Sequence, residues 1–282
     1  MSGERRVLVT GASSGIGEAC ALRLARAGWY VFAGVRATDD GERLRAAGSG
    51  RIEPVRVDVT DGASIAAAAQ WIGDGPLHGL VNNAGIALAM PLEFLPLNEL
   101  RRQLEVNLIG QVAVTQAFLP QLRAANGRIV FVGSVAGRSA LPFLGAYAAS
   151  KHALEAVADS LRIELRPFGI EVTIVEPGTI ATEIWRKGGE LFQQLAERVP
   201  GELGTLYGAR MTAFRDAATA AGRRAEPADG VAAVVESALT SERPKARILV
   251  GRDARRRARV ERLPARWRDR VYERVLLRSR PE

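Results

Sequence analysis

A serine, a tyrosine and a lysine in this chain are spaced so that they could carry out acid–base chemistry together. Tyr147 and Lys151 stand four residues apart, which places two side chains on one face of a helix. An ammonium about 4 Å from a phenol stabilises the phenolate by about 4 kcal/mol at an effective dielectric constant of about 20, enough to lower a tyrosine pKa from about 10 toward about 7. Such a tyrosine exchanges protons near neutral pH. Ser134, at the end of an apolar run, could hold a substrate oxygen beside the phenol.

The same residues also have ordinary explanations. The spacing Y-x-x-x-K is common, and Tyr147 could simply cover a helix while Lys151 is solvated. Ser134 could alternatively be the nucleophile of a serine hydrolase, but no G-x-S-x-G sequence surrounds it and His152, beside Lys151, is not placed as its base. The other motifs in the chain must decide between these alternatives.

A glycine-rich turn near the start of the chain indicates a nucleotide site. Residues 10–17 read T-G-A-S-S-G-I-G, between a short apolar run and an amphipathic stretch. Glycines there permit a tight turn and close approach of a phosphate, which the helix N-terminus then holds. The spacing is G-x-x-x-G-x-G rather than G-x-G-x-x-G, and any tight strand-to-helix turn also favours glycine.

The end of the second apolar run bears on the choice of cofactor. Dinucleotide sites commonly carry an acid there for the adenine ribose, but this chain has Arg36. A guanidinium pairs well with a 2′-phosphate, so we expect NADP, with NAD as the less favoured choice. Asp39 and Asp40 lie just beyond, and Arg36 could be an ordinary surface residue. Asp58 could bind the adenine amino group, with capping of the next helix by the adjacent Thr60 or Asp61 as the ordinary alternative for this segment.

Apolar runs alternate with amphipathic stretches along the whole chain. The runs cover residues 7–10, 30–35, 52–58, 80–82, 128–134, 171–176 and 248–250, and the longer stretches cover residues 18–27, 42–47, 64–72, 97–123 and 145–166. Runs rich in valine, isoleucine and leucine are typical of parallel strands buried on both faces. We therefore predict an α/β fold with a Rossmann-like, doubly wound parallel seven-stranded sheet and helices on both faces.

The length of the chain suggests one domain, and the distribution of charge distinguishes its last 31 residues from the rest. The chain has 282 residues, 47% of them apolar, which is enough for one large core. We expect a single dinucleotide-binding and catalytic domain over residues 1–251, with a mobile cap at about 181–227. Of the net charge of +8, nearly all comes from residues 252–282, which hold 12 arginines against 5 acidic residues.

Composition and motifs argue against several classes of protein. The chain has one cysteine, Cys20, and two histidines, so we expect no metal site. It has no apolar run of roughly 18 to 20 residues and no signal-peptide pattern at its start, so we expect a soluble cytoplasmic protein. No nucleic-acid-binding motif appears, so we expect no nucleic acid partner.

The arginine-rich segment 252–282 has apolar residues at helical spacing, interrupted by Pro264. Such an amphipathic basic segment could lie weakly on an anionic membrane surface. It could equally fold back over the domain with its arginines in solvent, and we favour this second alternative.

Together the motifs resemble the short-chain dehydrogenase/reductase family, in its single-domain branch. Five motifs occur in order over about residues 5–251, namely T-G-A-S-S-G-I-G at 10–17, D-V at 58–59, N-N-A-G at 82–85, Ser134 with Tyr147 and Lys151, and Pro177-Gly178. The resemblance implies a cofactor site formed by Gly11, Ser13, Ser14, Gly15, Ile16, Gly17, Arg36, Asp58, Val59, Asn82, Ala84, Gly85, Tyr147, Lys151, Pro177, Gly178, Ile180 and Thr182.

The same resemblance implies a catalytic tetrad of Asn107, Ser134, Tyr147 and Lys151. Tyr147 would be the general acid in reduction and the general base in oxidation, and Ser134 would orient the carbonyl. Lys151 would bond the nicotinamide ribose and lower the tyrosine pKa, and Asn107 would hold a water that relays protons to the lysine. Family members usually associate through the two long helices, here about 97–123 and 145–166, so we expect a homodimer or homotetramer.

Substrate preference is suggested by apolar residues that follow Ser134 and by those in the cap. Leu141, Phe143, Leu144, Ile184 and Trp185 could line a substrate pocket, or they could only pack on the core or on a partner subunit. The surrounding stretches resemble the hydroxysteroid and retinol dehydrogenase side of the family, which implies a bulky lipophilic substrate.

We therefore expect an NADP-dependent oxidoreductase that interconverts an alcohol and a ketone or aldehyde. The alternative is a dinucleotide-sensing binding protein on the same fold. The presence of Tyr147 and Lys151 together argues against it, because a sensor needs neither.

Overall fold

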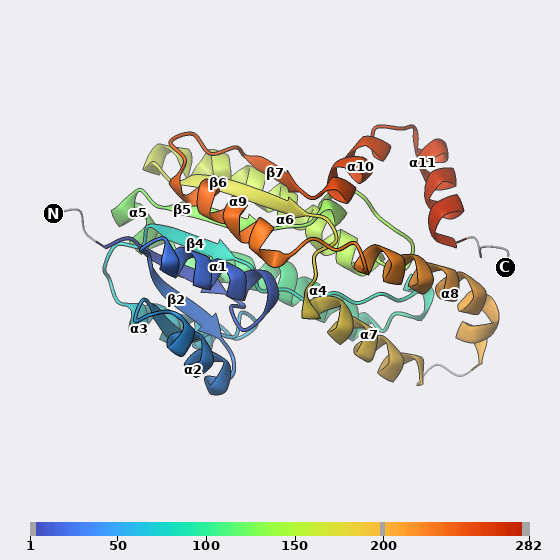
Figure 1. The fold of residues 1–282 in the computed structure, drawn as a ribbon, viewed down its shortest axis with the longest axis horizontal. Helices are drawn as coiled ribbons and strands as arrows, with labels where there is room; N and C mark the ends of the chain where they lie inside the picture. The colour runs from blue at the N-terminus through green and yellow to red at the C-terminus, as the bar shows by residue number, and fades with distance from the viewer. Residues whose placement is uncertain (1–3, 198–200, 278–282) are drawn as a thin grey trace.

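Seven short runs of valine, isoleucine and leucine form one parallel sheet in the computed structural model, which describes residues 4–197 and 201–277 (Figure 1). The strands are β1 (Arg6–Thr10), β2 (Tyr30–Val35), β3 (Ile52–Arg56), β4 (Gly79–Asn82), β5 (Arg128–Val132), β6 (Glu171–Pro177) and β7 (Arg247–Val250). Their order across the sheet is β3-β2-β1-β4-β5-β6-β7. The predicted doubly wound α/β fold is confirmed.

Alternate residues of each strand enter two separate cores. In β1, Val7 and Val9 pack on one face of the sheet while Leu8 packs on the other, and all three are fully buried. Because successive side chains of a strand point to opposite faces, a strand that is apolar at every position needs helices on both sides.

The helices supply that cover. They are α1 (Gly15–Arg26), α2 (Thr38–Ala47), α3 (Gly62–Ile72), α4 (Leu97–Leu104), α5 (Gly110–Ala125), α6 (Gly145–Glu164), α7 (Glu183–Ala196), α8 (Glu202–Gly222), α9 (Ala228–Thr240), α10 (Arg252–Val260) and α11 (Ala265–Tyr272). Helices α1, α2 and α9 contribute to the first core, and α3, α5 and α6 contribute to the second. The sheet therefore lies between two layers of helices.

Two predicted elements differ from the structure. The expected helix over 97–123 is divided into α4 and α5 by a π-helical turn, Glu105–Ile109, in which the Asn107 side chain bonds to a neighbouring loop. The third strand ends at Arg56 rather than at Asp58, because Asp58 turns to accept hydrogen bonds from Thr60.

The segment predicted as a cap contains α7 and α8, which extend beyond the carboxyl ends of the strands (Figure 1). Residues 198–200, between these helices, lie outside the described residues. Leu195 of α7 and Leu203 of α8 are buried in a third apolar cluster with Leu88, Met90 and other residues. This cluster joins the cap helices to the loop that follows β4.

The arginine-rich segment folds back as α10, α11 and a π-helical turn over Glu273–Leu277, and its last residues, 278–282, lie outside the described residues. Arg257 of α10 bonds to Ser139, and the buried Tyr272 donates a hydrogen bond to Glu261. Arg210 of α8 pairs with Glu273. No helix in the described ranges is both long and apolar enough to cross a membrane.

Candidate active site

A cleft of about 840 Å³ opens at the carboxyl ends of the strands, where the chain order reverses between β1 and β4. This reversal is the usual ligand site of a doubly wound sheet, because the loops after the two strands leave in opposite directions. The predicted cofactor residues that line the cleft are Gly11, Ser13, Ser14, Gly15, Ile16, Arg36, Asp58, Val59, Ala84, Gly85, Tyr147, Lys151, Pro177, Gly178, Ile180 and Thr182.

The glycine loop forms a cradle that larger side chains would fill. Gly11 and Gly15 have φ of 63° and 61°, a region that favours glycine. A Cβ on Gly17 would lie 2.2 Å from the Gly11 carbonyl oxygen, so only glycine lets α1 pack this closely against the loop. The exposed backbone at the start of α1 suits a phosphate, and the residues present therefore fit a dinucleotide.

Thr10 and Asn83 tie the glycine loop to the end of β4. The Thr10 hydroxyl accepts hydrogen bonds from the backbone N–H groups of Asn83 and Ala84, at 3.0 and 3.1 Å. In return the Asn83 amide donates to the carbonyl oxygens of Thr10 and Gly11, at 3.0 and 3.1 Å. The two loops that frame the cleft are therefore held at a fixed separation.

The adenine end of the cleft carries one acid and one base. Asp58 accepts hydrogen bonds from the backbone N–H and the hydroxyl of Thr60, at 3.0 and 2.8 Å. These bonds, chiefly that from the backbone, together with the charge on Arg36, hold the pKa of Asp58 below its usual value. Arg36 is exposed and lines the cleft beside it. Capping of α3 falls to Asp61, whose carboxylate accepts from the Ala63 N–H at 2.9 Å.

Ser134, Tyr147 and Lys151 meet at the other end of the cleft. Tyr147 is 6% exposed and Lys151 is 4% exposed, so bulk water has little access to either. Lys151 Nζ donates a hydrogen bond to the Val132 carbonyl oxygen at 2.9 Å and lies 5.9 Å from the centre of the Tyr147 ring. The Ser134 hydroxyl lies within hydrogen-bonding reach of the phenol. This group can hold a carbonyl oxygen and move a proton to or from it.

The expected fall of the Tyr147 pKa toward 7 through Lys151 is not found. Burial raises the pKa of Tyr147, and the effects that oppose this rise are the Ser134 hydrogen bond and the charge on Arg257. Burial also lowers the pKa of Lys151 to about 8, against a smaller opposing effect of Glu155. Lys151 does not lower the Tyr147 pKa as expected, because its amino group lies far from the phenol and is itself desolvated.

Asn107 does not line the cleft but supports its floor. Its Oδ1 accepts from the Ile86 N–H at 2.8 Å, and its amide donates to the Ile86 carbonyl oxygen at 2.9 Å and to Ser150 Oγ at 3.0 Å. Both amide hydrogens are therefore engaged, and a water held by this residue stays a prediction. The tie to Ser150 joins the π-helical turn to α6 between Tyr147 and Lys151.

Several predicted residues do not line the cleft. Asn82 is fully buried beneath it, with its amide bonded to Thr115 Oγ1 at 2.8 Å, and the adjacent Asn83 faces the cleft instead. Gly17 also lies below the surface of the cleft, where its role is packing. Ile184 and Trp185 do line it.

Three predicted substrate residues, Leu141, Phe143 and Leu144, are not among the residues that line the cleft. Phe143 makes edge-to-face contacts with Tyr207 and Phe214 of α8, and Leu144 is buried. The sequence shows an apolar turn here but not the cap helix that covers it, which is why these residues were expected in the pocket.

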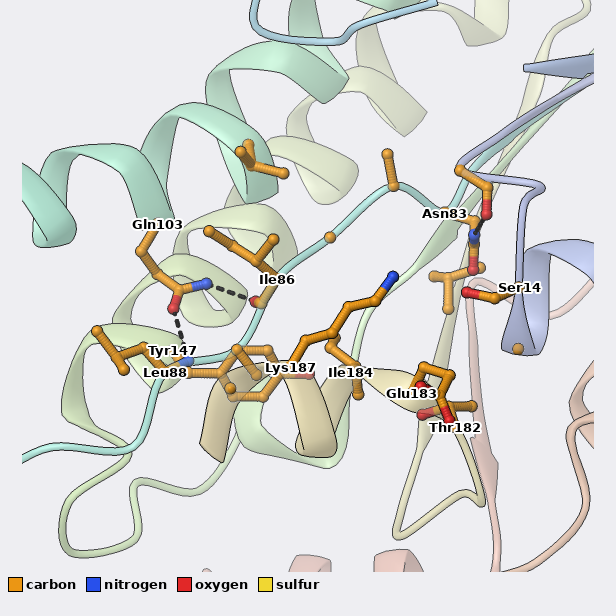
Figure 2. A pocket seen from close by; sticks show the side chains of 18 of the residues that line it. Ser14, Asn83, Ile86, Leu88, Gln103, Tyr147, Thr182, Glu183, Ile184 and Lys187 are labelled. Atoms are coloured by element: carbon orange, nitrogen blue, oxygen red, sulfur yellow. Dashed lines mark hydrogen bonds between the residues drawn. The ribbon is translucent and has the colours of Figure 1, made fainter. Parts of the chain in front are cut away.

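Two further residues of the cleft, Gln103 and Lys187, belong to none of the sequence motifs (Figure 2). Gln103 donates to the Ile86 carbonyl oxygen at 2.5 Å and accepts from the Leu88 N–H at 3.1 Å. It thereby fixes the strand-like loop after β4. Lys187 of α7 extends its amino group into the cleft, toward the side where Asn83 and Ser14 lie. For Gln103, the one signal in the sequence is its spacing, four residues before Asn107 in the predicted helix.

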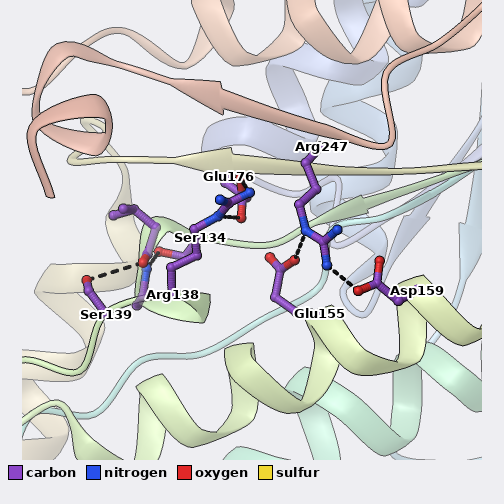
Figure 3. Close-up of polar contacts among 9 residues, drawn as sticks. Ser134, Arg138, Ser139, Glu155, Asp159, Glu176 and Arg247 are labelled. Carbon is purple, nitrogen blue, oxygen red and sulfur yellow. Dashed lines mark hydrogen bonds and ion pairs between the residues drawn. The ribbon is translucent and has the colours of Figure 1, made fainter. Parts of the chain in front are cut away.

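Two buried carboxyl groups, those of Glu155 and Glu176, lie near each other, and each is paired with an arginine (Figure 3). Glu176 is fully buried and forms a two-point pair with Arg138, while Glu155 bonds to Arg247 at 2.9 Å. Glu155 Oε1 is buried and has no other hydrogen-bond partner. Burial and the neighbouring Glu176 raise the pKa of Glu155 to about 7. A proton shared between the two acids would satisfy the unpaired oxygen.

Comparison with known proteins agrees with this geometry. The family model for short chain dehydrogenase matches residues 5–190. The chain is 39% identical to the 17-beta-hydroxysteroid dehydrogenase type 6 of Bos taurus and 38% identical to the retinol dehydrogenase 16 of Homo sapiens, each over 89% of this chain and 82% of the relative. It is 34% identical to an NADPH-dependent 3-dehydrocapnine reductase of Ornithobacterium rhinotracheale, over 95% and 96%. A short chain dehydrogenase/reductase of Burkholderia phymatum solved with NAD has a TM-score of 0.77 and 27% identity, over 91% and 92%.

A doubly wound sheet with a dinucleotide cradle and a buried serine, tyrosine and lysine defines a class of nicotinamide-dependent oxidoreductases. The chain belongs to the short-chain dehydrogenase family and is an NAD(P)-dependent oxidoreductase. The predicted likeness to hydroxysteroid and retinol dehydrogenases is confirmed. No three histidine, cysteine, aspartate or glutamate side chains among the described residues gather as a metal site requires.

The raised pKa of Glu155 generates a prediction about stability. Between pH 4.5 and about 7 the folded protein holds a proton that the unfolded chain releases, so the free energy of unfolding falls as the pH rises through this window. Glu155→Gln removes this proton linkage. The fall in melting temperature between pH 5 and pH 7.5 should therefore be several degrees smaller in the variant than in wild type.

Calorimetry at both pH values checks this, with Glu164→Gln, an exposed acid on the same helix, as the control. An equal fall in melting temperature for wild type and Glu155→Gln would contradict the assignment.

Proposed function

We propose that the protein is an NADP-dependent oxidoreductase that interconverts an alcohol and a ketone or aldehyde on a bulky lipophilic substrate. The observation that carries this proposal is the single cleft, which runs from the glycine cradle to the paired hydroxyl groups of Ser134 and Tyr147. A cofactor lying in the cradle would have its reactive end directed toward the buried Tyr147 and Lys151. We also propose a cytoplasmic location, which suits a buried, unpaired Cys20.

The roles of the chain's own residues follow from their places. The nicotinamide supplies or accepts the hydride when it is bound. Ser134 holds the substrate oxygen, and the Tyr147 hydroxyl donates a proton to it in reduction and accepts one in oxidation. Lys151 bonds the nicotinamide ribose and brings a positive charge toward the phenol.

The preference for NADP rests on Arg36. Its side chain is exposed at the adenine end, and the described structure places no carboxylate within ion-pairing distance of it. Its guanidinium is therefore free to pair with a 2′-phosphate. The relative named as NADPH-dependent supports this preference, whereas the structure solved with NAD shows that related proteins differ in this respect.

The lipophilic substrate is supported by the lining of the cleft near Tyr147. Ile184 packs against the phenol, and the Trp185 ring meets it edge-on at 5.9 Å. Trp185 is nevertheless 40% exposed, which leaves an aromatic surface at the mouth of the cleft. The names of the hydroxysteroid and retinol relatives point to the same class of substrate.

Substitution of Tyr147 tests the mechanism. Tyr147→Phe removes the hydroxyl that transfers the proton and should lower turnover by about 10²-fold or more while NADPH still binds. The measurement is NADPH absorbance over a panel of ketosteroids, retinal and small ketones, with cofactor affinity followed by fluorescence. Turnover by the variant at the wild-type rate would show that Tyr147 is not the acid.

Substitution of Arg36 tests the cofactor preference. Arg36→Ala should weaken NADPH binding about 10- to 100-fold, because it removes a charge-assisted pair, and should leave NADH binding unchanged. Titrations with both nucleotides measure the ratio. Arg45→Ala is the control, since Arg45 is already paired with Glu42 and Glu53. An unchanged ratio in Arg36→Ala would assign the preference to another group.

We further propose a homodimer or homotetramer that forms through α5 and α6. Ile109, in the π-helical turn just before α5, is 50% exposed and Ile163 on α6 is 71% exposed, so each of these two helical regions presents one large apolar side chain to the surface. Light scattering after size exclusion should give two or four times the chain mass, and Ile163→Asp should shift the protein toward the monomer. A wild-type monomer at micromolar concentration would exclude this assembly.

A further inference from the structure

Helix α7 of the cap lies across the cleft and contacts both of the loops that frame it. Thr182, the residue before the helix, packs on the glycine loop, where a Cβ added to Gly15 would lie 3.0 Å from the Thr182 methyl carbon. Further along α7, Gly188 packs on the loop after β4, and a Cβ added to it would lie 2.2 Å from the Ala87 carbonyl oxygen. The start of α7 is therefore held against both loops.

Lys187 lies between these two contacts along the chain and extends its side chain into the cleft. It is one of the residues that line the cleft. Figure 2 shows its amino group directed into the cleft, toward the side where Ser14 and Asn83 lie. Ser14 belongs to the glycine loop, and Asn83 bonds to the backbone of that loop. The ammonium group therefore extends from the cap toward the glycine cradle.

The carboxylates nearest to Lys187 along the cap helix are paired with another cation. Glu183 and Glu190 both line the cleft, and both form ion pairs with Arg186. Among residues 4–197 and 201–277, no carboxylate oxygen lies within 4.0 Å of the Lys187 amino group. A lysine ammonium is a compact charge with three donors, and it commonly binds phosphate. The charge of Lys187 is thus available to an anionic group in the cleft.

The place of Lys187 along the cleft indicates which part of the cofactor it meets. Across the sheet, Arg36 follows β2, the glycine loop follows β1, and Ser134 follows β5 on the far side of β4. The glycine loop therefore lies between the adenine end and the catalytic end. In NAD and NADP the diphosphate joins the two nucleosides, so it occupies this middle part. The ammonium of Lys187 and the backbone N–H groups at the start of α1 converge there.

We propose that Lys187 binds the diphosphate of the cofactor from the cap side, opposite the glycine loop. The diphosphate is common to NAD and NADP, so this role depends neither on the preference for NADP nor on the identity of the substrate. The inference goes beyond the function proposed above and needs only that the enzyme uses NAD(P). It also makes α7 responsive to the cofactor, because the bound diphosphate adds a contact that the free protein lacks.

The test uses ADP-ribose, which contains the diphosphate but has neither a nicotinamide nor a 2′-phosphate. Calorimetry on the full chain measures its affinity for wild type and for Lys187→Gln. The variant should bind ADP-ribose about 5- to 20-fold more weakly, because it loses a charge-assisted contact in a cleft that is open to water. NADH and NADPH should be weakened by the same factor.

Two further variants serve as controls. Lys245→Gln removes another exposed lysine, one that does not line the cleft, and should bind all three nucleotides as wild type does. Lys187→Arg keeps the positive charge and should recover most of the lost affinity. The melting temperature of ligand-free Lys187→Gln should equal that of wild type, since the Lys187 side chain is exposed.

Hydrogen exchange of the α7 backbone gives a second readout that does not depend on affinity. With enough ADP-ribose to saturate both proteins, exchange in α7 should slow several-fold more in wild type than in Lys187→Gln. Equal slowing in the two proteins would show that the diphosphate does not contact the cap through this residue.

Three results of the titrations would also overturn the proposal. Unchanged affinity of Lys187→Gln for ADP-ribose would show that the lysine does not bind the diphosphate. Weaker binding of NADH with ADP-ribose unaffected would place Lys187 at the nicotinamide end. Equal losses in Lys187→Gln and Lys187→Arg would show that its charge is not what binds.

The function proposed above is judged separately, by turnover in Tyr147→Phe and by the ratio of NADPH to NADH affinity in Arg36→Ala. Neither result bears on ADP-ribose, which is not a substrate and carries no 2′-phosphate. The two proposals can therefore fail independently.

Discussion

The hydrogen bonds between the ends of β1 and β4 are the constraint on which this site depends. Two neighbouring parallel strands end there, and their loops separate to open the cleft. Without a tie, the glycine loop would be free to move away from the loop after β4. Thr10 and Asn83 supply that tie through four hydrogen bonds between a side chain and a backbone group, and these bonds hold the shape of the cradle. The glycines contribute by allowing the two backbones to lie this close.

The site contains charged side chains whose burial lowers the stability of the fold. Lys151 lies where its ammonium is poorly solvated, and Glu155, next to Glu176, lies one turn further along α6. Arg138 and Arg247 partly compensate these acids, while the Val132 carbonyl oxygen orients the lysine. Because water is excluded, each of these charges acts strongly on its neighbours. The same exclusion of water raises the pKa of the Tyr147 phenol, which the Ser134 hydroxyl and the charge on Arg257 oppose.

Local patterns in the sequence were sufficient for the sheet and for the cofactor end of the cleft. Strands that are apolar at every position require helices on both faces, and the glycine loop is a contiguous motif whose geometry is set by its own residues. Most of the predicted cofactor residues therefore line the cleft. Asn82 was expected to line the cleft, but the next residue, Asn83, lines it instead. The sequence does not show which of the two side chains points into the cleft, because that depends on how the end of β4 is oriented in the sheet.

Contacts between distant parts of the chain could not be predicted in this way. Phe143 looked like a pocket residue because its partners, Tyr207 and Phe214, belong to a helix whose placement no local pattern gives. The π-helical turn at Asn107 depends on a hydrogen bond to Ile86. Arg257 was one of many arginines in a basic segment, and its contact with Ser139 spans 118 positions of the chain.

The attachment of α10 to Gly178 has a consequence for the order in which the site is completed. Asp253 of α10 accepts a hydrogen bond from the Thr179 N–H beside Gly178, and α10 is synthesised after the glycine loop, so the wall behind Gly178 is absent until α10 has left the ribosome. A domain that folds as it emerges can form the nucleotide cradle while its reactive end still lacks this wall. The wall at Gly178 is thus closed from solvent later than the nucleotide cradle.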